Sequence, residues 1–402
     1  MSTPPPAIPL PPPPTAAPLP NEEDDHLHTR AVADRDATRQ AREQMVGQRP
    51  GTLIVREDAL PPRLFLISYD ENFYKEHEFH QYDELLAYFQ KHPEQKHWID
   101  VRGYDDLPLM QRIQEDFRIH PLQMEDVLGD YQRAKVEETE DGLFLVSRMT
   151  EFTRLLDIDD DQLSIFTGSN YVLTFQDDYD DCLEAVRLRL RTGRSNIRRR
   201  TPLYLAYALT DVVLDHYYPT MAAIGDYLET LEERIFQGRP DRRVLNRILH
   251  IKKDIVRFRR LVYPEREKIA ELLRMPDETV PEEIKVFFKD CYDHAIQALD
   301  LAESYRETVS SLVELYMSDQ SNRANEVMKV LTIISSIFIP LSFVVGLYGM
   351  NFQREAPDGR INYLNMPELY SPWGYPVLLG LLLLIVIGQL TYFYRKGWLT
   401  NR

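Results

Sequence analysis

Two long uncharged runs near the C-terminus limit what this chain can fold into. No Asp, Glu, Lys or Arg occurs in residues 330–353, a run of 24, or in residues 369–394, a run of 26. A helix needs about 20 apolar residues to cross the hydrocarbon core of a bilayer, which is roughly 30 Å thick. We therefore predict two transmembrane helices, 329–350 and 372–394, joined by a short loop, 351–371.

The charges that flank these spans predict their orientation. Basic residues lie on the side that carries both chain ends: Arg323, Lys329, Arg395, Lys396 and Arg402. The loop has an acidic excess, and cytoplasmic flanks are usually the basic ones. The first twenty residues contain ten prolines and do not resemble a secretory signal. We expect a multi-pass protein of the cell (inner) membrane with both termini, including the basic tail 395–402, in the cytoplasm.

Composition narrows the class of partner. The chain has 402 residues and a net charge of −17, which argues against nucleic acid and suits a protein that meets cations. Its two cysteines, Cys182 and Cys291, offer neither a disulfide framework nor a thiolate metal cage. The basic run 187–200 is interpreted as a solvated helix face, or a contact with lipid or an acidic partner, rather than a nucleic-acid site.

The rest of the chain divides by pattern. Residues 1–51 are rich in proline and charge and predict a disordered tail. Residues 52–200 contain short alternating runs such as "RLFLIS", "HWIDV" and "LFLVSRM", with a hairpin turn at 168–170 and helical periodicity in "LMQRIQEDF". This predicts a cytoplasmic α/β domain. The acidic runs "DIDDD" (157–161) and "DDYDD" (177–181) are interpreted as loops.

Residues 201–328 lack strand signals and repeat apolar residues every three and four positions. They predict a cytoplasmic helical domain and a stalk. Because no helix breaker lies between Val286 and Ile339, the stalk is expected to run directly into the first span as one helix of roughly 60 residues. The fold class is therefore α+β, with an α/β N-terminal domain, a long-helix stalk and two C-terminal transmembrane helices.

One face of the first span carries small, polar and a few large apolar residues. They step by three and four along the helix: Asn325, Met328, Thr332, Ser335, Ile339, Ser342, Gly346 and Gly349. Close packing against a neighbouring helix would explain such a face. A pore lining would also explain it, but two spans cannot enclose a water-filled path, so that hypothesis requires an oligomer.

The absence of charge in this stripe favours one kind of ion. Mg²⁺ gives up its six waters reluctantly, so neutral carbonyl and hydroxyl groups suit the hydrated ion. Carboxylates in mid-membrane are costly to bury. Large apolar residues on or beside the stripe, Met328, Leu331 and Ile339, would narrow the path and close it by dewetting, or serve ordinary packing.

Several segments resemble the CorA family of magnesium and cobalt transport proteins. They are "IHPLQMEDVL", "QRAKVEE", "YLAYALTD", "FFKDCYDHAIQ", "SNRANEVMKVLTIISSIFIPLSFVVGLYGMNF", "MPEL", "WGYPVLL" and "YFYRKGWL", in the family's order. The resemblance covers about residues 60–402. It implies a homopentameric funnel in the membrane lipid that transports Mg²⁺ and Co²⁺, with Ni²⁺ as a further candidate.

The resemblance also implies site residues. Gly349, Met350 and Asn351 would form the outer mouth, where Asn351 offers amide oxygens to metal-bound water and Glu368 adds negative potential. Glycine at 349 would let the chain turn without a Cβ clash. Cytoplasmic Mg²⁺ bound between subunits would hold the pore shut. The matching acidic residues are Glu125, Asp126, Asp211, Asp290 and Glu314.

Two departures from the family pattern affect the mouth and the stalk. Residues 353–365 lengthen the loop between the signature and "MPEL". Ile339 stands where Met is frequent, and Glu314 where Asp is. The main alternative function is a zinc transporter with proton coupling on the same two-span plan. A membrane-anchored enzyme is not favoured, because the ten histidines form no zinc signature and no nucleotide or nucleophile motif occurs. A receptor that conducts nothing is a further alternative.

Overall fold

The structure is a computed structural model of the whole chain. It describes residues 47, 49–56, 58–129, 132–152, 158–193, 196–237, 242–350, 355 and 359–399. The predicted tail, 1–51, lies almost entirely outside these residues. The chain divides into two compact units, Met1–Val313 and Glu314–Arg402. The domain boundaries at residues 200 and 328 stay predictions.

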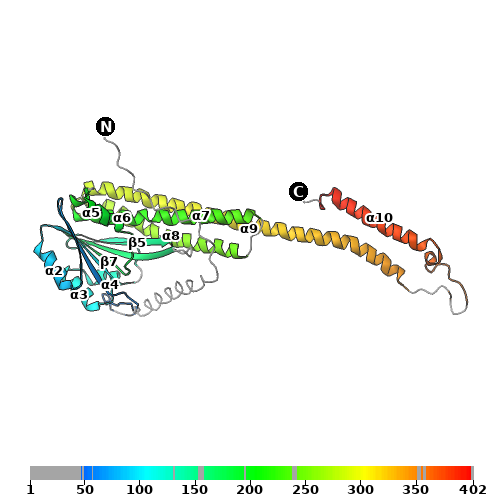
Figure 1. Cartoon of the computed structure of the whole chain (residues 1–402), viewed down its shortest axis with the longest axis horizontal. Helices are drawn as coiled ribbons and strands as arrows, with labels where there is room; N and C mark the ends of the chain where they lie inside the picture. Colours follow the sequence, from blue (N-terminus) through cyan, green and yellow to red (C-terminus); the bar gives the residue numbers. More distant parts are fainter. Residues whose placement is uncertain are drawn as a thin grey trace, which may run out of the picture. The chain divides into compact units, whose positions relative to one another are not determined.

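A seven-stranded sheet lies at the centre of the first unit (Figure 1). Its spatial order is β2-β1-β3-β7-β6-β5-β4. The strands are β1 (Arg63–Tyr69), β2 (Tyr74–Phe79), β3 (Lys96–Arg102), β4 (Lys135–Glu138), β5 (Leu143–Phe152), β6 (Ile158–Thr167) and β7 (Tyr171–Gln176). Strands β3 and β7 pair in parallel, and every other neighbouring pair is antiparallel.

The predicted hairpin at 168–170 is confirmed. Strand β6 ends at Thr167 and β7 begins at Tyr171, and the Gly168 N–H donates to the Tyr171 carbonyl oxygen at 2.9 Å. A Cβ on Gly168 would lie 2.1 Å from Cε1 of Tyr171, so any other residue in this turn would have to displace the Tyr171 ring. The runs "RLFLIS", "HWIDV" and "LFLVSRM" also form strands as predicted.

Three short helices cover one face of the sheet. They are α2 (Tyr82–Lys91), α3 (Leu107–Asp116) and α4 (Pro121–Leu128). Their apolar side chains form one buried cluster with alternate residues of β1, β3, β5 and β7. Asp106 caps α3, because its carboxylate accepts from the Leu109 N–H at 2.9 Å.

The other face packs against the short helix α5 (Glu184–Thr192) and three longer helices (Figure 1): α6 (Pro202–Asp215), α7 (Tyr217–Phe236) and α8 (Arg242–Arg274). A fully buried ion pair fastens α8 to strand β5. Nζ of Lys268 lies 2.5 Å from Glu265 and also donates to the Ser147 hydroxyl at 2.5 Å. Glu265 in turn accepts from the Arg148 N–H at 2.9 Å.

The prediction that "DIDDD" is a loop is wrong for its last four residues, and Asp157 lies outside the described residues. Ile158 to Asp161 open strand β6 and pair with the end of β5. Asp160 is only 9% exposed, and its carboxylate is bound by Arg148 and Arg257. Two guanidinium groups compensate the buried charge, so an acidic run can form an interior strand. The "DDYDD" segment lies outside strands and helices, as predicted.

The basic run 187–200 is not a purely solvated face. Arg187 is buried, and its guanidinium bonds to Asp181 and lies 3.3 Å from Asp100. It also lies over the Trp98 ring, 5.3 Å from the centroid. This arginine therefore joins α5 to the sheet rather than meeting a partner.

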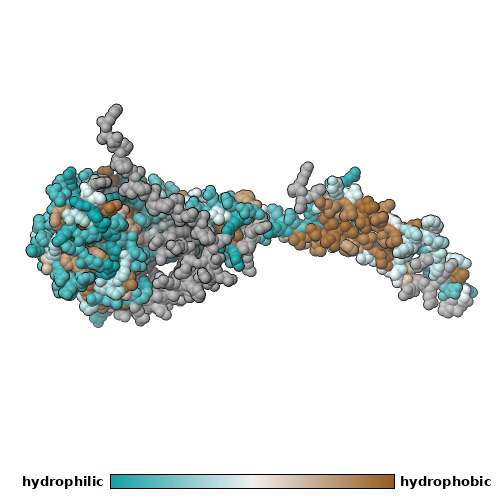
Figure 2. Space-filling view, in the orientation of Figure 1, coloured by the Kyte–Doolittle hydropathy of each residue, from teal (hydrophilic) through white to brown (hydrophobic). Residues whose placement is uncertain are grey.

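Helix α9 (Glu282–Tyr348) is a single helix of 67 residues, about 100 Å long at 1.5 Å per residue. The prediction that the stalk continues into the first span is confirmed. A short 3₁₀ turn, η3 (Pro367–Tyr370), comes next in the chain. Helix α10 (Gly374–Arg395) follows it. Figure 2 shows hydrophobic surface over the end of α9 and over α10, and both helices are long and apolar enough to cross a membrane.

Candidate ion path and cation sites

The stripe predicted from the sequence lies along the membrane end of α9. All its members from 325 to 349 are exposed in the single chain except Ser335, which is half-buried. Leu331, which flanks the stripe, is 55% exposed. The Thr332 hydroxyl donates to the Met328 carbonyl oxygen of its own helix at 2.7 Å. No charged side chain lies on the stripe.

A different face of α9 is partly covered within the second unit. Its half-buried residues share one side of the helix: Lys329, Ile333, Ser336, Ile337, Pro340, Val344 and Tyr348, with half-buried Leu341 at the edge. On this face Gln389 of α10 donates to the Ser336 carbonyl oxygen at 2.9 Å. At 3.6 residues per turn, the centres of the covered face and the stripe are roughly 140° apart around the helix. Helix α10 therefore leaves the stripe uncovered.

An open hollow of about 500 Å³ lies on the membrane part of α9. Its lining comprises Leu331, Thr332, Ser335, Ser336, Ile339 and Pro340. Four of these six are residues predicted to line the path. The hollow is neutral, and its polar groups are hydroxyls and backbone carbonyls, which suit a hydrated cation better than a bare one.

The predicted mouth is described in part. Gly349 and Met350 follow the end of α9, whereas Asn351 lies outside the described residues. Gly349 does not have a positive φ. A Cβ there would lie 3.3 Å from the Val345 carbonyl oxygen, a tight contact but not a clash. The expected need for glycine at a sharp turn is therefore weaker than the sequence indicated.

Glu368 lies in η3, and its side chain is exposed. Its carbonyl oxygen accepts from the Ser371 N–H at 3.2 Å. The same oxygen would lie 2.0 Å from a Cβ on Gly374, the first residue of α10. The close approach of these two backbones fixes where Glu368 stands relative to the second span.

One cluster of possible metal ligands occurs among the described residues. Ligand atoms of Asp211, Asp215 and His294 all lie within 4.8 Å of one another. Asp211 and Asp215 are one turn apart on α6, and His294 comes from α9. His294 Nδ1 lies 3.6 Å from Asp215 Oδ1 and makes no hydrogen bond within the described chain. Two carboxylates and an imidazole are suitable ligands for a divalent cation.

Asp211 is the most buried member of this cluster, at 7% exposure. Burial raises the pKa of Asp211, and the nearby Asp215 charge raises it further. Arg189 lies 3.9 Å away and opposes this only in part, while the Cys291 thiol donates to Asp211 at 3.7 Å. A bound cation would relieve the repulsion between the two carboxylates.

Glu125 and Asp126 lie side by side on α4 and already have partners in the single chain. Glu125 Oε2 accepts from the Gly51 N–H at 2.6 Å. Asp126 is bound by Lys135 at 2.5 Å and by the Gln132 side-chain amide at 2.5 Å. A cation at either carboxylate must compete with these donors.

Asp290 and Glu314 are exposed on α9. Of the five predicted regulatory residues, only Asp211 belongs to the described cluster. Sequence reasoning missed Asp215 and His294. The signal was present, because Asp211 and Asp215, and likewise Asp290 and His294, are four residues apart and so share a helix face.

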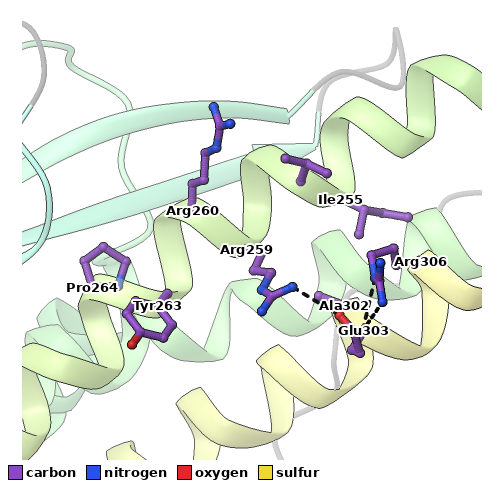
Figure 3. Close-up of a pocket in the computed structure, with 9 residues that line it drawn as sticks. Ile255, Arg259, Arg260, Tyr263, Pro264, Ala302, Glu303 and Arg306 are labelled. Atoms are coloured by element: carbon purple, nitrogen blue, oxygen red, sulfur yellow. Dashed lines mark hydrogen bonds and ion pairs between the residues drawn. The ribbon is translucent and has the colours of Figure 1, made fainter.

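A second hollow, of about 400 Å³, lies between α8 and α9 in the first unit (Figure 3). Arg259, Arg260 and Arg306 are among its lining residues, and Glu303 accepts from both Arg259 and Arg306. Arg260 points away from these three side chains in Figure 3. The guanidinium groups of Arg259 and Arg306 against the one carboxylate of Glu303 give this hollow a positive balance. It would repel a divalent cation and is not a second metal site.

Comparison with known proteins decides the family. The family described as CorA-like Mg²⁺ transporter protein matches residues 93–395, which include strands β3 to β7, the stalk and both apolar helices. This chain belongs to that family. The resemblance drawn from the sequence motifs is therefore confirmed.

Two proteins named CorA match over most of their length. The chain is 36% identical over 358 residues to the cobalt/magnesium transport protein CorA of Thermotoga maritima, covering 88% of this chain and 97% of that protein. It is 26% identical over 303 residues to the CorA of Methanocaldococcus jannaschii, covering 75% of this chain and 91% of that one.

The fold is also that of a CorA protein. The complete structure of the CorA magnesium transporter from Methanocaldococcus jannaschii matches with a TM-score of 0.66 at 22% identity. The match covers 87% of this chain and all of that one. The predicted plan of an α/β N-terminal domain, a long helix and two C-terminal apolar helices is confirmed for this CorA-family chain.

Proposed function

We propose that this chain is a Mg²⁺ channel or transporter that also carries Co²⁺ and moves these ions into the cytoplasm. The observation that carries the proposal is the neutral stripe of α9, which helix α10 leaves uncovered. The named CorA relatives transport cobalt and magnesium, in keeping with this proposal. No enzymatic step is part of it.

The described part of a single copy has two apolar helices long enough to cross a membrane, and two such helices cannot enclose a path. We infer that copies assemble around an axis, as a homopentamer, with the stripe of each first span facing that axis and α10 facing lipid. The exposed stripe supports this arrangement because polar groups facing hydrocarbon would cost free energy. The protein spans the cell (inner) membrane with both termini in the cytoplasm, in keeping with the basic flanks.

The ion is expected to enter at the Gly349–Asn351 mouth and to stay hydrated. Amide oxygens of Asn351 would accept hydrogen bonds from metal-bound water, and Glu368 would raise the local cation concentration. Thr332, Ser335 and Ser342 then offer hydroxyls along the path. Met328, Leu331 and Ile339 are the apolar positions that would close it by dewetting.

Cytoplasmic Mg²⁺ is proposed to regulate the path. Glu125, Asp126, Asp211, Asp290 and Glu314 are the acidic residues expected to bind it between subunits. The Asp211–Asp215–His294 cluster supports a cation site at α6 and α9 within one chain. Loss of the ion would leave carboxylates repelling one another, which favours movement of the stalk that continues into the first span.

Flux into liposomes tests the proposal. Purified protein should admit Mg²⁺, and Asn351→Ala should abolish the flux while the oligomer stays intact. The matched control is Asn362→Ala, an exposed asparagine of the same loop. Normal flux in the Asn351 variant would remove its role in the mouth. Flux that prefers Zn²⁺ and needs a proton gradient would instead support the zinc transporter alternative.

A further inference from the structure

Proline in the first span leaves one backbone acceptor without its usual donor. Helix α9 contains Pro340 within the segment that is apolar enough to cross a membrane. Proline has no N–H, so the hydrogen bond that residue 340 would donate to the Ser336 carbonyl cannot form. An unpaired carbonyl in hydrocarbon is costly, and helices bend at such positions.

The second span supplies a donor for that carbonyl. Gln389 lies on the half-buried face of α10, and its Nε2 donates to the Ser336 carbonyl oxygen at 2.9 Å. The two residues are 53 positions apart in the chain. The Gln389 side chain therefore replaces the backbone N–H that Pro340 lacks.

The polar group on α10 is not needed for packing alone. The other half-buried residues of that face are small or aliphatic, namely Gly374, Leu378, Leu382, Ile385 and Val386. Gln389 Oε1 is buried and has no hydrogen-bond partner in the described part of the chain. A buried acceptor without a donor destabilises the structure, so an aliphatic residue would serve packing better.

The bond lies at the level of the proposed path. Ser336 and Pro340 line the same hollow as Thr332, Ser335 and Ile339. Proline favours a bend in a helix, and a bend at Pro340 would set the direction of the helix above it and so the distance of these side chains from the proposed axis. Whether the Ser336 carbonyl is paired decides how stable that bend is.

We propose that Gln389 is a positioning residue, which holds the bend of the first span at Pro340 and so sets the width of the path at Thr332, Ser335 and Ile339. The effect on the path rests on the proposed transport function. The hydrogen bond and the bend can be tested without that function. An interhelical hydrogen bond of typical strength in a membrane shifts an equilibrium about threefold.

A double-mutant cycle separates this role from general helix contact. Q389M keeps the length of the side chain and removes the donor. P340A restores the backbone N–H, so the Ser336 carbonyl is paired within its own helix. We expect Q389M to change Mg²⁺ flux, or the Mg²⁺ concentration that half-inhibits it, by about threefold or more, and to have no such effect when P340A is present.

Amide hydrogen exchange of residues 333–347 in lipid nanodiscs gives a readout that does not need transport. Q389M should speed exchange there in the unaltered chain and leave it unchanged in the P340A background. Thr391→Val is the matched control, because the Thr391 hydroxyl donates only within α10, to the Ile387 carbonyl oxygen at 2.7 Å.

Each outcome decides the proposal. If Q389M has the same effect in the unaltered chain and in P340A, Gln389 only contributes to contact between the two helices, and the proposal is overturned. If Q389M speeds amide exchange only when Pro340 is present but leaves Mg²⁺ flux unchanged, the claim that Gln389 sets the width of the path is overturned. If the unaltered protein carries no Mg²⁺, the transport function fails, while the exchange cycle still decides whether Gln389 holds the bend.

Discussion

Nζ of Lys135 lies 2.5 Å from the Asp126 carboxylate, and the pair is partly buried. The same ammonium lies 2.5 Å from Glu137. Burial alone would lower the pKa of Lys135, but the two carboxylates raise it above its usual value. Asp126, one of the acidic residues expected to bind regulatory Mg²⁺, is thus neutralised within its own chain, and an arriving cation must displace Lys135.

Lys135→Met should make the protein more sensitive to cytoplasmic Mg²⁺. The variant frees Asp126, so the cation no longer competes with an ammonium group. A partly exposed pair contributes up to about 1 kcal/mol, which corresponds to a shift of up to about fivefold in the half-inhibitory Mg²⁺ concentration. Liposome flux against internal Mg²⁺ measures this shift. Lys91→Met, at an exposed lysine, is the control, and a variant less sensitive than the unaltered protein would contradict the competition.

His294→Ala should weaken Co²⁺ binding more than Mg²⁺ binding. Imidazole nitrogen is a good ligand for transition metals, whereas Mg²⁺ prefers oxygen ligands and its own water. Loss of the His294 ligand should reduce Co²⁺ affinity by about tenfold or more and leave Mg²⁺ affinity nearly unchanged. Calorimetric titration of the purified assembly with each metal tests this, with exposed His80→Ala as control. Equal losses for both metals would argue against His294 as a ligand.

Helices and turns that are determined by residues close together in the chain could be predicted from the sequence. The uncharged runs predicted two apolar helices, and α9 and α10 occupy them. The absence of a helix breaker between Val286 and Ile339 predicted one continuous helix from stalk to span, and alternation around Gly168 predicted the β6–β7 hairpin. Each of these depends on residues within a few turns or strands of one another.

Features that depend on distant partners could not be predicted. Asp160 lies in a strand because Arg148 and Arg257 compensate its charge, and Arg257 is 97 residues away. The cation cluster needs α6 and α9 to bring Asp215 within 3.6 Å of His294. The residue pattern of one segment does not indicate which distant segment will pack against it.

Asp181→Asn should destabilise the cytoplasmic domain at neutral pH. Burial alone would raise the pKa of Asp181, but hydrogen bonds and charge from Arg187, together with the Arg102 charge, lower it below 3.8. The side chain is 2% exposed, and removing one partner of a buried pair costs about 3–5 kcal/mol. Guanidinium titration of the purified protein at pH 7 measures the loss. Exposed Asp180→Asn, in the same segment, should change little.

The same ion pair predicts how stability depends on acid. Because the folded pKa of Asp181 is depressed, its stabilisation is present above the unfolded value of 3.8 and is lost as pH falls through the lower folded pKa. The difference between the unaltered protein and Asp181→Asn should therefore be largest near neutral pH and shrink below about pH 4. A difference that stays constant down to pH 2 would mean that the Asp181 charge does not cause it.

Gly374→Ala should displace the turn that carries Glu368. A Cβ at residue 374 would lie 2.0 Å from the Glu368 carbonyl oxygen, well inside van der Waals contact, so either η3 or the start of α10 must move. Since that backbone sets the position of the Glu368 carboxylate, we expect lower Mg²⁺ flux at low external Mg²⁺, where attraction of the ion to the mouth limits entry. Gly380→Ala in the same helix is the matched control, because no atom lies within 4 Å of a Cβ there. Comparison with Glu368→Gln separates the position of the carboxylate from its charge. If Gly374→Ala and Glu368→Gln lose flux to the same extent and Gly380→Ala loses none, the turn acts by placing the carboxylate. Full flux in Gly374→Ala would show that the mouth tolerates displacement of the turn.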